Sequence, residues 1–208
     1  YNAGNVSVSI SSLKSSSASY AGGIAGMNSG TIANCHNVDN VSADVSSSTF
    51  YLDPYAGGIV GKNFETITNC YNVGDVSASI SPSSSSNPYA GGIAAYNGDS
   101  VVNCYNAGNV SASILSSDSS FNTYAGGIVA NNKNGVFTNC YNTGNVSAST
   151  SSSNKFSYCY AGGIAADNEN GVFTNCFYLD NIENGVASGT GDPVKCTTNQ
   201  MKQQDTFS

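Results

Sequence analysis

The sequence predicts an all-β fold, a parallel β-solenoid of about five three-strand coils that ends in a short C-terminal capping segment. Two observations lead to this fold class. The pentapeptide Tyr-Ala-Gly-Gly-Ile recurs about every 35 residues, which is a period typical of stacked repeat proteins. Each repeat also contains short extended runs and no helical pattern. The five copies begin at Tyr20, Tyr55, Tyr89, Tyr124 and Tyr160.

The second repeat shows the three extended runs of one unit. They are Tyr55–Gly61, Thr66–Asn72 and Val76–Ile80. The third run alternates apolar residues with serines, which is the period of a half-buried strand, and it recurs at Val6, Val110 and Val146. Leucine-rich, ankyrin and tetratricopeptide units need helical or leucine-spaced patterns that are absent here. Each unit is therefore predicted to form one coil, with parallel strands about 4.8 Å apart.

Serine-rich segments of varying length follow each alternating run, and we expect them to be loops at one edge of the solenoid. These segments are Ser11–Ser19, Ser46–Pro54, Ser81–Pro88, Ser116–Thr123 and Thr150–Cys159.

Equivalent residues of stacked coils should form columns. One buried aliphatic column is predicted at Ile24, Ile59, Ile93, Ile128 and Ile164. A second is predicted at Ile32, Ile67, Val101, Phe137 and Phe173. The glycine pairs between tyrosine and isoleucine indicate a narrow coil in which backbones approach closely.

Cysteine and asparagine occupy two further periodic positions. We expect a buried column of thiols that act as small hydrophobic groups at Cys35, Cys70, Cys104, Cys140 and Cys176. The asparagine before each of them tolerates a left-handed turn, and its amide can bond to the next coil. These residues are Asn34, Asn69, Asn103, Asn139 and Asn175. Cys159 and Cys196 lie outside the column and are the one pair considered for a disulfide.

The chain divides into a repeat array over residues 1–180 and a C-terminal cap over residues 181–208. Thr197 and Gln200 have the spacing of a capping box, which predicts one short helix over Thr198–Gln204. Such a cap would cover the open end of a solenoid. The chain starts inside a repeat, at Tyr1-Asn2, so we expect it to be a segment of a longer protein.

Composition argues against several classes of partner. The formal net charge is −7 and the chain has only six basic residues, so no nucleic-acid partner is expected. No stretch approaches the roughly 18 apolar residues of a membrane helix, and we expect no membrane insertion of this segment. With 39% hydrophobic residues and 13 tyrosines, the chain should fold rather than stay disordered.

Candidate catalytic groups are sparse. Asp167 and Glu169 are close in sequence but fall in a turn position, and His36 is the single histidine. A glycosidase needs two facing carboxylates, and a triad needs a nucleophile beside a base, so neither set provides a catalytic constellation. Asp39 and Asp75 carry carboxylates that could bind calcium, but asparagine stands at the position of Asp75 in other repeats, at Asn5, Asn109 and Asn145. We therefore expect no enzyme activity, no metal and no cofactor.

A binding function would use the serine-rich loops or a column of exposed tyrosines whose rings could stack on sugars. This column comprises Tyr71, Tyr105 and Tyr141. The structural alternative is that the tyrosines only cover the outside of the solenoid.

The repeats resemble the GLUG repeats of bacterial surface proteins, which have a Gly-Leu-aliphatic-Gly core. Gly58-Ile59-Val60-Gly61 and Gly23-Ile24-Ala25-Gly26 fit this core with isoleucine for leucine, and the TITNCYN and GNVS segments fit as well. The ending CFYLD followed by TTNQMKQQDTF is similar to segments that close such arrays. The core departs from the pattern where its last glycine is alanine, at Ala95, Ala130 and Ala166.

The resemblance implies an exported protein in the cell envelope or outside the cell, often adhesin-like. As a scaffold or spacer it would act as a monomer. As a binding face it would take a host or environmental glycan or protein. Similar repeats also lie beside the catalytic region of streptococcal immunoglobulin-A-cleaving metallopeptidases, which makes an accessory region of an extracellular peptidase or polysaccharide-active enzyme the third reading. The family offers no catalytic residue to carry over.

Overall fold

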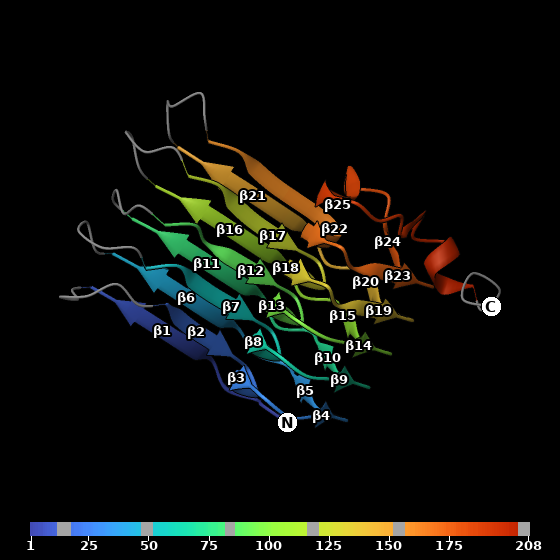
Figure 1. Ribbon diagram of the computed structural model, residues 1–208, viewed down its shortest axis with the longest axis horizontal. Coiled ribbons are helices and arrows are strands. Elements are labelled where there is room, and N and C mark those ends of the chain that lie inside the picture. The colour runs from blue at the N-terminus through green and yellow to red at the C-terminus, as the bar shows by residue number, and fades with distance from the viewer. Residues whose placement is uncertain (12–17, 47–51, 82–85, 116–120, 152–156, 204–208) are drawn as a thin grey trace.

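The computed structural model describes residues 1–11, 18–46, 52–81, 86–115, 121–151 and 157–203. Over these residues the protein is a parallel β-solenoid whose helical structure is limited to one short 3₁₀ segment, η1 (Gln200–Lys202). Figure 1 shows the strands stacked side by side from one end of the molecule to the other. The predicted serine-rich loops fall largely on residues outside the described ranges. No helix of the described chain is long and apolar enough to span a membrane.

Each turn contains five short strands, so the predicted three per coil was too few. The second turn consists of β7 (Pro54–Gly57), β8 (Val60–Asn63), β9 (Ile67–Thr68), β10 (Tyr71–Asn72) and β11 (Val76–Ile80). A bend at Gly58 and Ile59 interrupts the first predicted run, and Asn69 interrupts the second with a left-handed φ of 52°. Both interruptions bend the chain, which lets one short unit close around a core.

The other turns repeat this order. The first consists of β2 (Ser19–Gly22), β3 (Ala25–Asn28), β4 (Ile32–Ala33), β5 (His36–Asn37) and β6 (Val41–Val45). The third consists of β12 (Tyr89–Gly91), β13 (Ala94–Asn97), β14 (Val101–Val102), β15 (Tyr105–Asn106) and β16 (Val110–Ile114). The fourth consists of β17 (Thr123–Gly126), β18 (Val129–Lys133), β19 (Val136–Thr138), β20 (Tyr141–Asn142) and β21 (Val146–Thr150).

The solenoid thus has about four turns, where the sequence predicts about five. One strand, β1 (Val6–Ile10), precedes the first turn. A fifth turn begins with β22 (Cys159–Glu169), β23 (Val172–Thr174) and β24 (Phe177–Leu179). It stays incomplete because the chain then leaves for β25 (Asn184–Gly189), which pairs with β22, and β26 (Val194–Cys196), which pairs with β24.

The strands form four sheets with parallel pairing throughout the pairs described. The alternating Val-Ser-Ala-Ser-Ile strands make one sheet, named here the VSASI sheet, which consists of β1, β6, β11, β16 and β21. A path of nine strands runs through the Tyr-Ala-Gly strands and the strands that follow them, and β25, as a branch, makes this a ten-strand sheet. The pairing is in register with the repeat, for example Tyr71 with Tyr105. Identical side chains therefore stack in columns.

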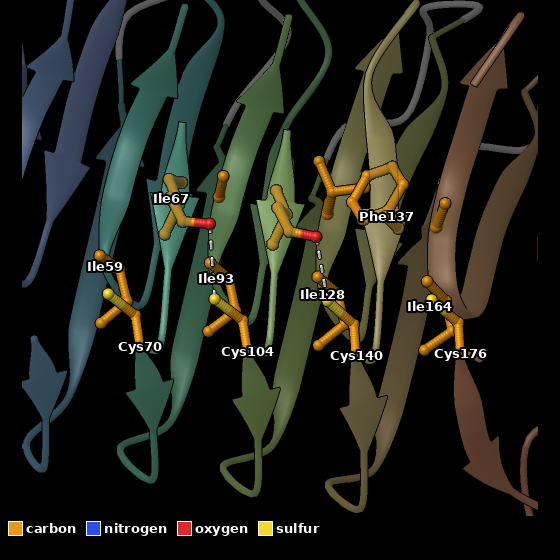
Figure 2. Packing of buried hydrophobic residues seen from close by; sticks show 14 of the residues in the cluster. Ile59, Ile67, Cys70, Ile93, Cys104, Ile128, Phe137, Cys140, Ile164 and Cys176 are labelled. Carbon is orange, nitrogen blue, oxygen red and sulfur yellow. Dashed lines mark hydrogen bonds between the residues drawn. The ribbon is translucent and has the colours of Figure 1, made fainter. Parts of the chain in front are cut away.

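The core lies between these sheets. The isoleucine column Ile59, Ile93, Ile128 and Ile164 has no exposed surface, whereas Ile24 at the N-terminal end is half-buried. Figure 2 shows these isoleucines beside Cys70, Cys104, Cys140 and Cys176 and opposite Ile67 and Phe137. A separate cluster fills the space behind the VSASI sheet with valine and alanine. These small side chains allow the VSASI sheet and the Tyr-Ala-Gly strands to approach each other closely.

The end segment contains the predicted capping-box contacts. The N–H of Thr197 donates to Gln200 Oε1 at 2.8 Å, and the N–H of Gln200 donates to Thr197 Oγ1 at 3.2 Å. The helix that follows is the 3₁₀ turn η1, shorter than the predicted Thr198–Gln204, whose last residue lies outside the described chain.

Candidate binding surface

The three candidate tyrosines lie on β10, β15 and β20 and stack on one another. Ring centroids are 4.9 Å apart between Tyr71 and Tyr105 and 5.0 Å apart between Tyr105 and Tyr141, with interplanar angles of 5° and 4°. His36 continues the stack at 4.8 Å from Tyr71, and Tyr1 stacks on His36. Each inner ring therefore covers the faces of its neighbours. Along the column, ring edges face outward, whereas stacking on a sugar uses ring faces.

A cavity of about 270 Å³ lies where this tyrosine column meets the predicted asparagine column. Its lining residues are Asn139, Tyr141, Asn175 and Phe177. Aromatic rings and side-chain amides both line it. A combination of aromatic surface and a few polar groups is typical of small-molecule binding sites. Two adjacent turns contribute to it.

A second tyrosine column was not singled out as a site by the sequence reasoning, although the first letter of the repeated pentapeptide marks it. Its rings stack at centroid distances of 4.7–5.2 Å and belong to Tyr20, Tyr55, Tyr89, Tyr124 and Tyr160. Burial, followed by the charge of nearby Asp53, raises the pKa of Tyr55 well above its ordinary value of 10.0. Lys62 Nζ lies 5.6 Å from the ring centre of Tyr20, which places a cation over one end of this column.

Lys62 also contacts two other aromatic rings. Its Nζ lies 5.0 Å from the ring centres of both Phe64 and Tyr96. Tyr96 is its partner on the next strand, so the contact follows from the register of β8 and β13. The ammonium group of Lys62 therefore lies against aromatic rings of the protein itself.

Two buried asparagine ladders form the most extensive polar feature of the interior. In each, Nδ2 donates to Oδ1 of the asparagine one turn further on, at 2.7–2.8 Å in one ladder and 2.7–2.9 Å in the other. The first ladder is Asn2, Asn37, Asn72, Asn106 and Asn142; the second is Asn28, Asn63, Asn97, Asn132 and Asn168. The sequence reasoning missed both, although Asn follows Tyr or His at the same place in the first four repeats.

The predicted asparagine column lies elsewhere, at exposed turns. Its members have φ between 50° and 55°. Their amides also bond from turn to turn, at 2.9–3.3 Å, so the column combines left-handed turns with a surface ladder. These residues are Asn34, Asn69, Asn103, Asn139 and Asn175.

The cysteine column lies in the core, with Cys35 half-buried at its N-terminal end and the other four buried. The thiol of Cys104 donates to the carbonyl oxygens of Val102 at 3.2 Å and Ile67 at 3.9 Å. Burial raises the pKa of Cys140 well above its ordinary value. Cys159 is exposed on β22 and Cys196 is buried on β26, in different sheets, and both are free thiols. The column is a packing element rather than a reactive site.

The acidic candidates are dispersed. Asp75 Oδ1 accepts the backbone N–H of Asn109 at 2.8 Å, a contact that asparagine makes in other turns. Asp167 accepts from Asn131 at 3.5 Å, and Glu169 forms an exposed ion pair with Lys133 at 3.5 Å. Within the described ranges, no three His, Cys, Asp or Glu side chains are grouped to hold a metal ion.

Comparison with known proteins finds one match. No curated protein and no solved structure matches the chain. A family model described as the GLUG motif matches residues 54–77, which run from the start of β7 into β11 and so cover one turn of the solenoid. Over this turn the chain is similar to the GLUG motif.

Proposed function

We propose that this chain is a non-catalytic repeat module of an exported bacterial surface protein, where it acts as an adhesin-like scaffold or spacer. The observation that carries the proposal is the continuity of the columns. The same buried residues recur in register from turn to turn, and polar interior groups bond along the axis rather than toward an opening. A surface location agrees with the acidic, lightly charged composition and with the GLUG-like turn. The module acts as a monomer.

A direct binding face is the second candidate. The cavity between Tyr141 and Phe177 favours it, because it brings together aromatic and amide groups at the surface. The ligand would be a glycan or a protein of a host or of the environment. An accessory region of an extracellular peptidase or polysaccharide-active enzyme is a weaker variant, in which the catalytic groups belong to another part of the parent protein.

A glycan array with a matched pair of variants tests the two candidates. One variant replaces Tyr71, Tyr105 and Tyr141 by alanine; the control replaces them by phenylalanine, which keeps the ring stack. The scaffold proposal predicts no specific retention of the wild-type chain on any glycan. Specific retention that the alanine variant loses, with an unchanged circular dichroism spectrum, would establish the binding face instead. Turnover of a polysaccharide or peptide by the isolated chain would contradict both.

A further inference from the structure

One lysine of the ten-strand sheet lies among aromatic rings from three successive turns. Lys62 Nζ is 5.0 Å from the ring centres of both Phe64 and Tyr96 and 5.6 Å from that of Tyr20. The rings of Phe64 and Tyr96 are 6.1 Å apart and tilted by 56°. The strands at this place, β3, β8 and β13, are paired neighbours in the N-terminal half of the solenoid (Figure 1). One cation and three rings are therefore gathered at one place on the molecule.

The cluster also exposes apolar side chains. Met27 is the partner of Lys62 on β3 and is 53% exposed, and Phe64 is 41% exposed. The name Lys62 patch is used below for Tyr20, Met27, Lys62, Phe64 and Tyr96. Aromatic residues and methionine are enriched at protein–protein interfaces, and methionine adapts its shape to different partners. The patch thus has the composition of an interaction surface.

The fold does not need these side chains. The column that contains Lys62 continues in the later turns with Asn131 and Asp167. In the other turns, the place of Phe64 in the repeat is taken by Ser29, Gly98, Lys133 and Glu169. Because the solenoid forms with polar residues or glycine at these positions, packing does not explain the aromatic and apolar residues of the patch.

The charge of Lys62 has no ionic partner within the described part of the chain, where the ion pair that forms joins Lys133 and Glu169. The chain has 13 acidic and six basic residues, so carboxylates are not scarce. Aromatic rings attract a cation through their quadrupole, but they carry no net charge. The ammonium group of Lys62 therefore remains able to attract an anion from a partner.

We propose that the Lys62 patch docks a segment of a partner protein in which a carboxylate side chain lies next to an apolar one. The carboxylate accepts a hydrogen bond from the Lys62 ammonium group, and the apolar side chain packs on Phe64 and Met27. A glycan is a poorer occupant, because it would stack on ring faces and Lys62 already lies over the rings. This docking surface goes beyond the proposed scaffold function, since a scaffold can hold such a segment without changing its own turns.

The test uses the intact chain, isotopically labelled, and two synthetic peptides, GLEFG and GLQFG, which are acetylated and amidated at their ends. Amide resonances of Lys62–Phe64 and Tyr96 should shift when GLEFG is added. GLEFG should bind about threefold more tightly than GLQFG, because an ion pair at the surface adds a modest attraction. Added salt should reduce this difference, since it screens exposed charges.

A matched pair of lysine variants then locates the attraction. In Lys62→Gln, the affinities of the two peptides should agree within about 1.5-fold, whereas Lys133→Gln removes the same charge elsewhere and should keep the preference of about threefold. Phe64→Ser should weaken both peptides by a similar factor of about three. Asn131 and Ser29 show that the solenoid accepts polar residues at both positions, so the variants should fold.

Equal affinity of the two peptides for the wild-type chain would overturn the proposal, and so would a preference for GLEFG that persists in Lys62→Gln. Resonance shifts confined to the other three sheets would place the binding elsewhere and overturn it as well. Tighter binding of trigalacturonic acid than of GLEFG would assign the patch to an acidic glycan instead. Absence of peptide binding would leave the scaffold function standing, because the deletion of a turn tests that function separately.

Discussion

Gly92 packs directly against the buried amide of Asn106. A Cβ built at Gly92 would lie 2.4 Å from Asn106 Cγ and 2.1 Å from the carbonyl oxygen of Gly127. The same contact joins Gly58 to Asn72 in the preceding turn. In the first four repeats, the second glycine of the pentapeptide and the asparagine that follows Tyr or His are therefore one packing unit, although they are distant in sequence.

Gly92→Ala is expected to destabilise the fold strongly. The added methyl group meets backbone and a ladder amide that other ladder members hold in place, so the cost should be about 1–3 kcal/mol or more. Urea unfolding of the variant measures it. Gly30→Ala is the matched control, because no atom lies within 4 Å of a Cβ at Gly30. Similar stabilities of the two variants would show that the close packing at Gly92 is not required.

Asn106→Ala is expected to cost about 1–3 kcal/mol for each buried polar group left without a partner. Asn106 Nδ2 donates to Asn142 Oδ1 and to the carbonyl oxygen of Gly108, and its Oδ1 accepts from Asn72. Asn109→Ala is the control, since Asn109 is exposed and water can replace its contacts. Chemical unfolding curves should separate the two variants, and overlapping curves would mean that the ladder adds little to stability.

The sequence predicted the solenoid and the column of left-handed asparagines, but it did not predict the two buried asparagine ladders. Both Asn69 and Asn72 recur with the same period, so periodicity cannot distinguish them. Which of the two is buried depends on the left-handed φ at Asn69. This turn points the side chain of Asn69 outward and that of Asn72 into the core. The number of strands per turn was also predicted wrongly, because nothing in the sequence pattern shows that the chain bends at the glycine pair.

The column of tyrosines that begin the repeated pentapeptides, which includes Tyr89, predicts a loss of stability at alkaline pH. Burial raises the pKa of Tyr89 well above its ordinary value of 10.0, with the neighbouring Tyr55 and Asp53 adding to the shift. Its contribution is fully present below the unfolded pKa and is lost as pH rises from about 10 toward the folded pKa. Free energies of unfolding between pH 8 and 11 should fall more steeply for the wild type than for Tyr89→Phe. Identical slopes would contradict the shift.

Thiol reactivity should separate the cysteines by burial. Cys159 is exposed and should react with a thiol reagent in the folded protein, and the half-buried Cys35 should react more slowly. Cys140 has no exposed surface and a raised pKa, so its labelling should wait for unfolding. Mass spectrometry of peptides from timed samples gives each rate. Labelling of Cys140 as fast as Cys159 would show that the thiol column is open to solvent.

If the module is a scaffold built of equivalent turns, one turn can be removed without changing the others, and deleting a turn tests the proposed function most directly. A chain in which Pro88 is joined to Tyr124, without residues 89–123, keeps every column in register with one member fewer. Its crystal structure should show the same solenoid shortened by about 4.8 Å, the spacing of one strand. A deletion variant that fails to fold, or one that rearranges its remaining columns, would contradict the account.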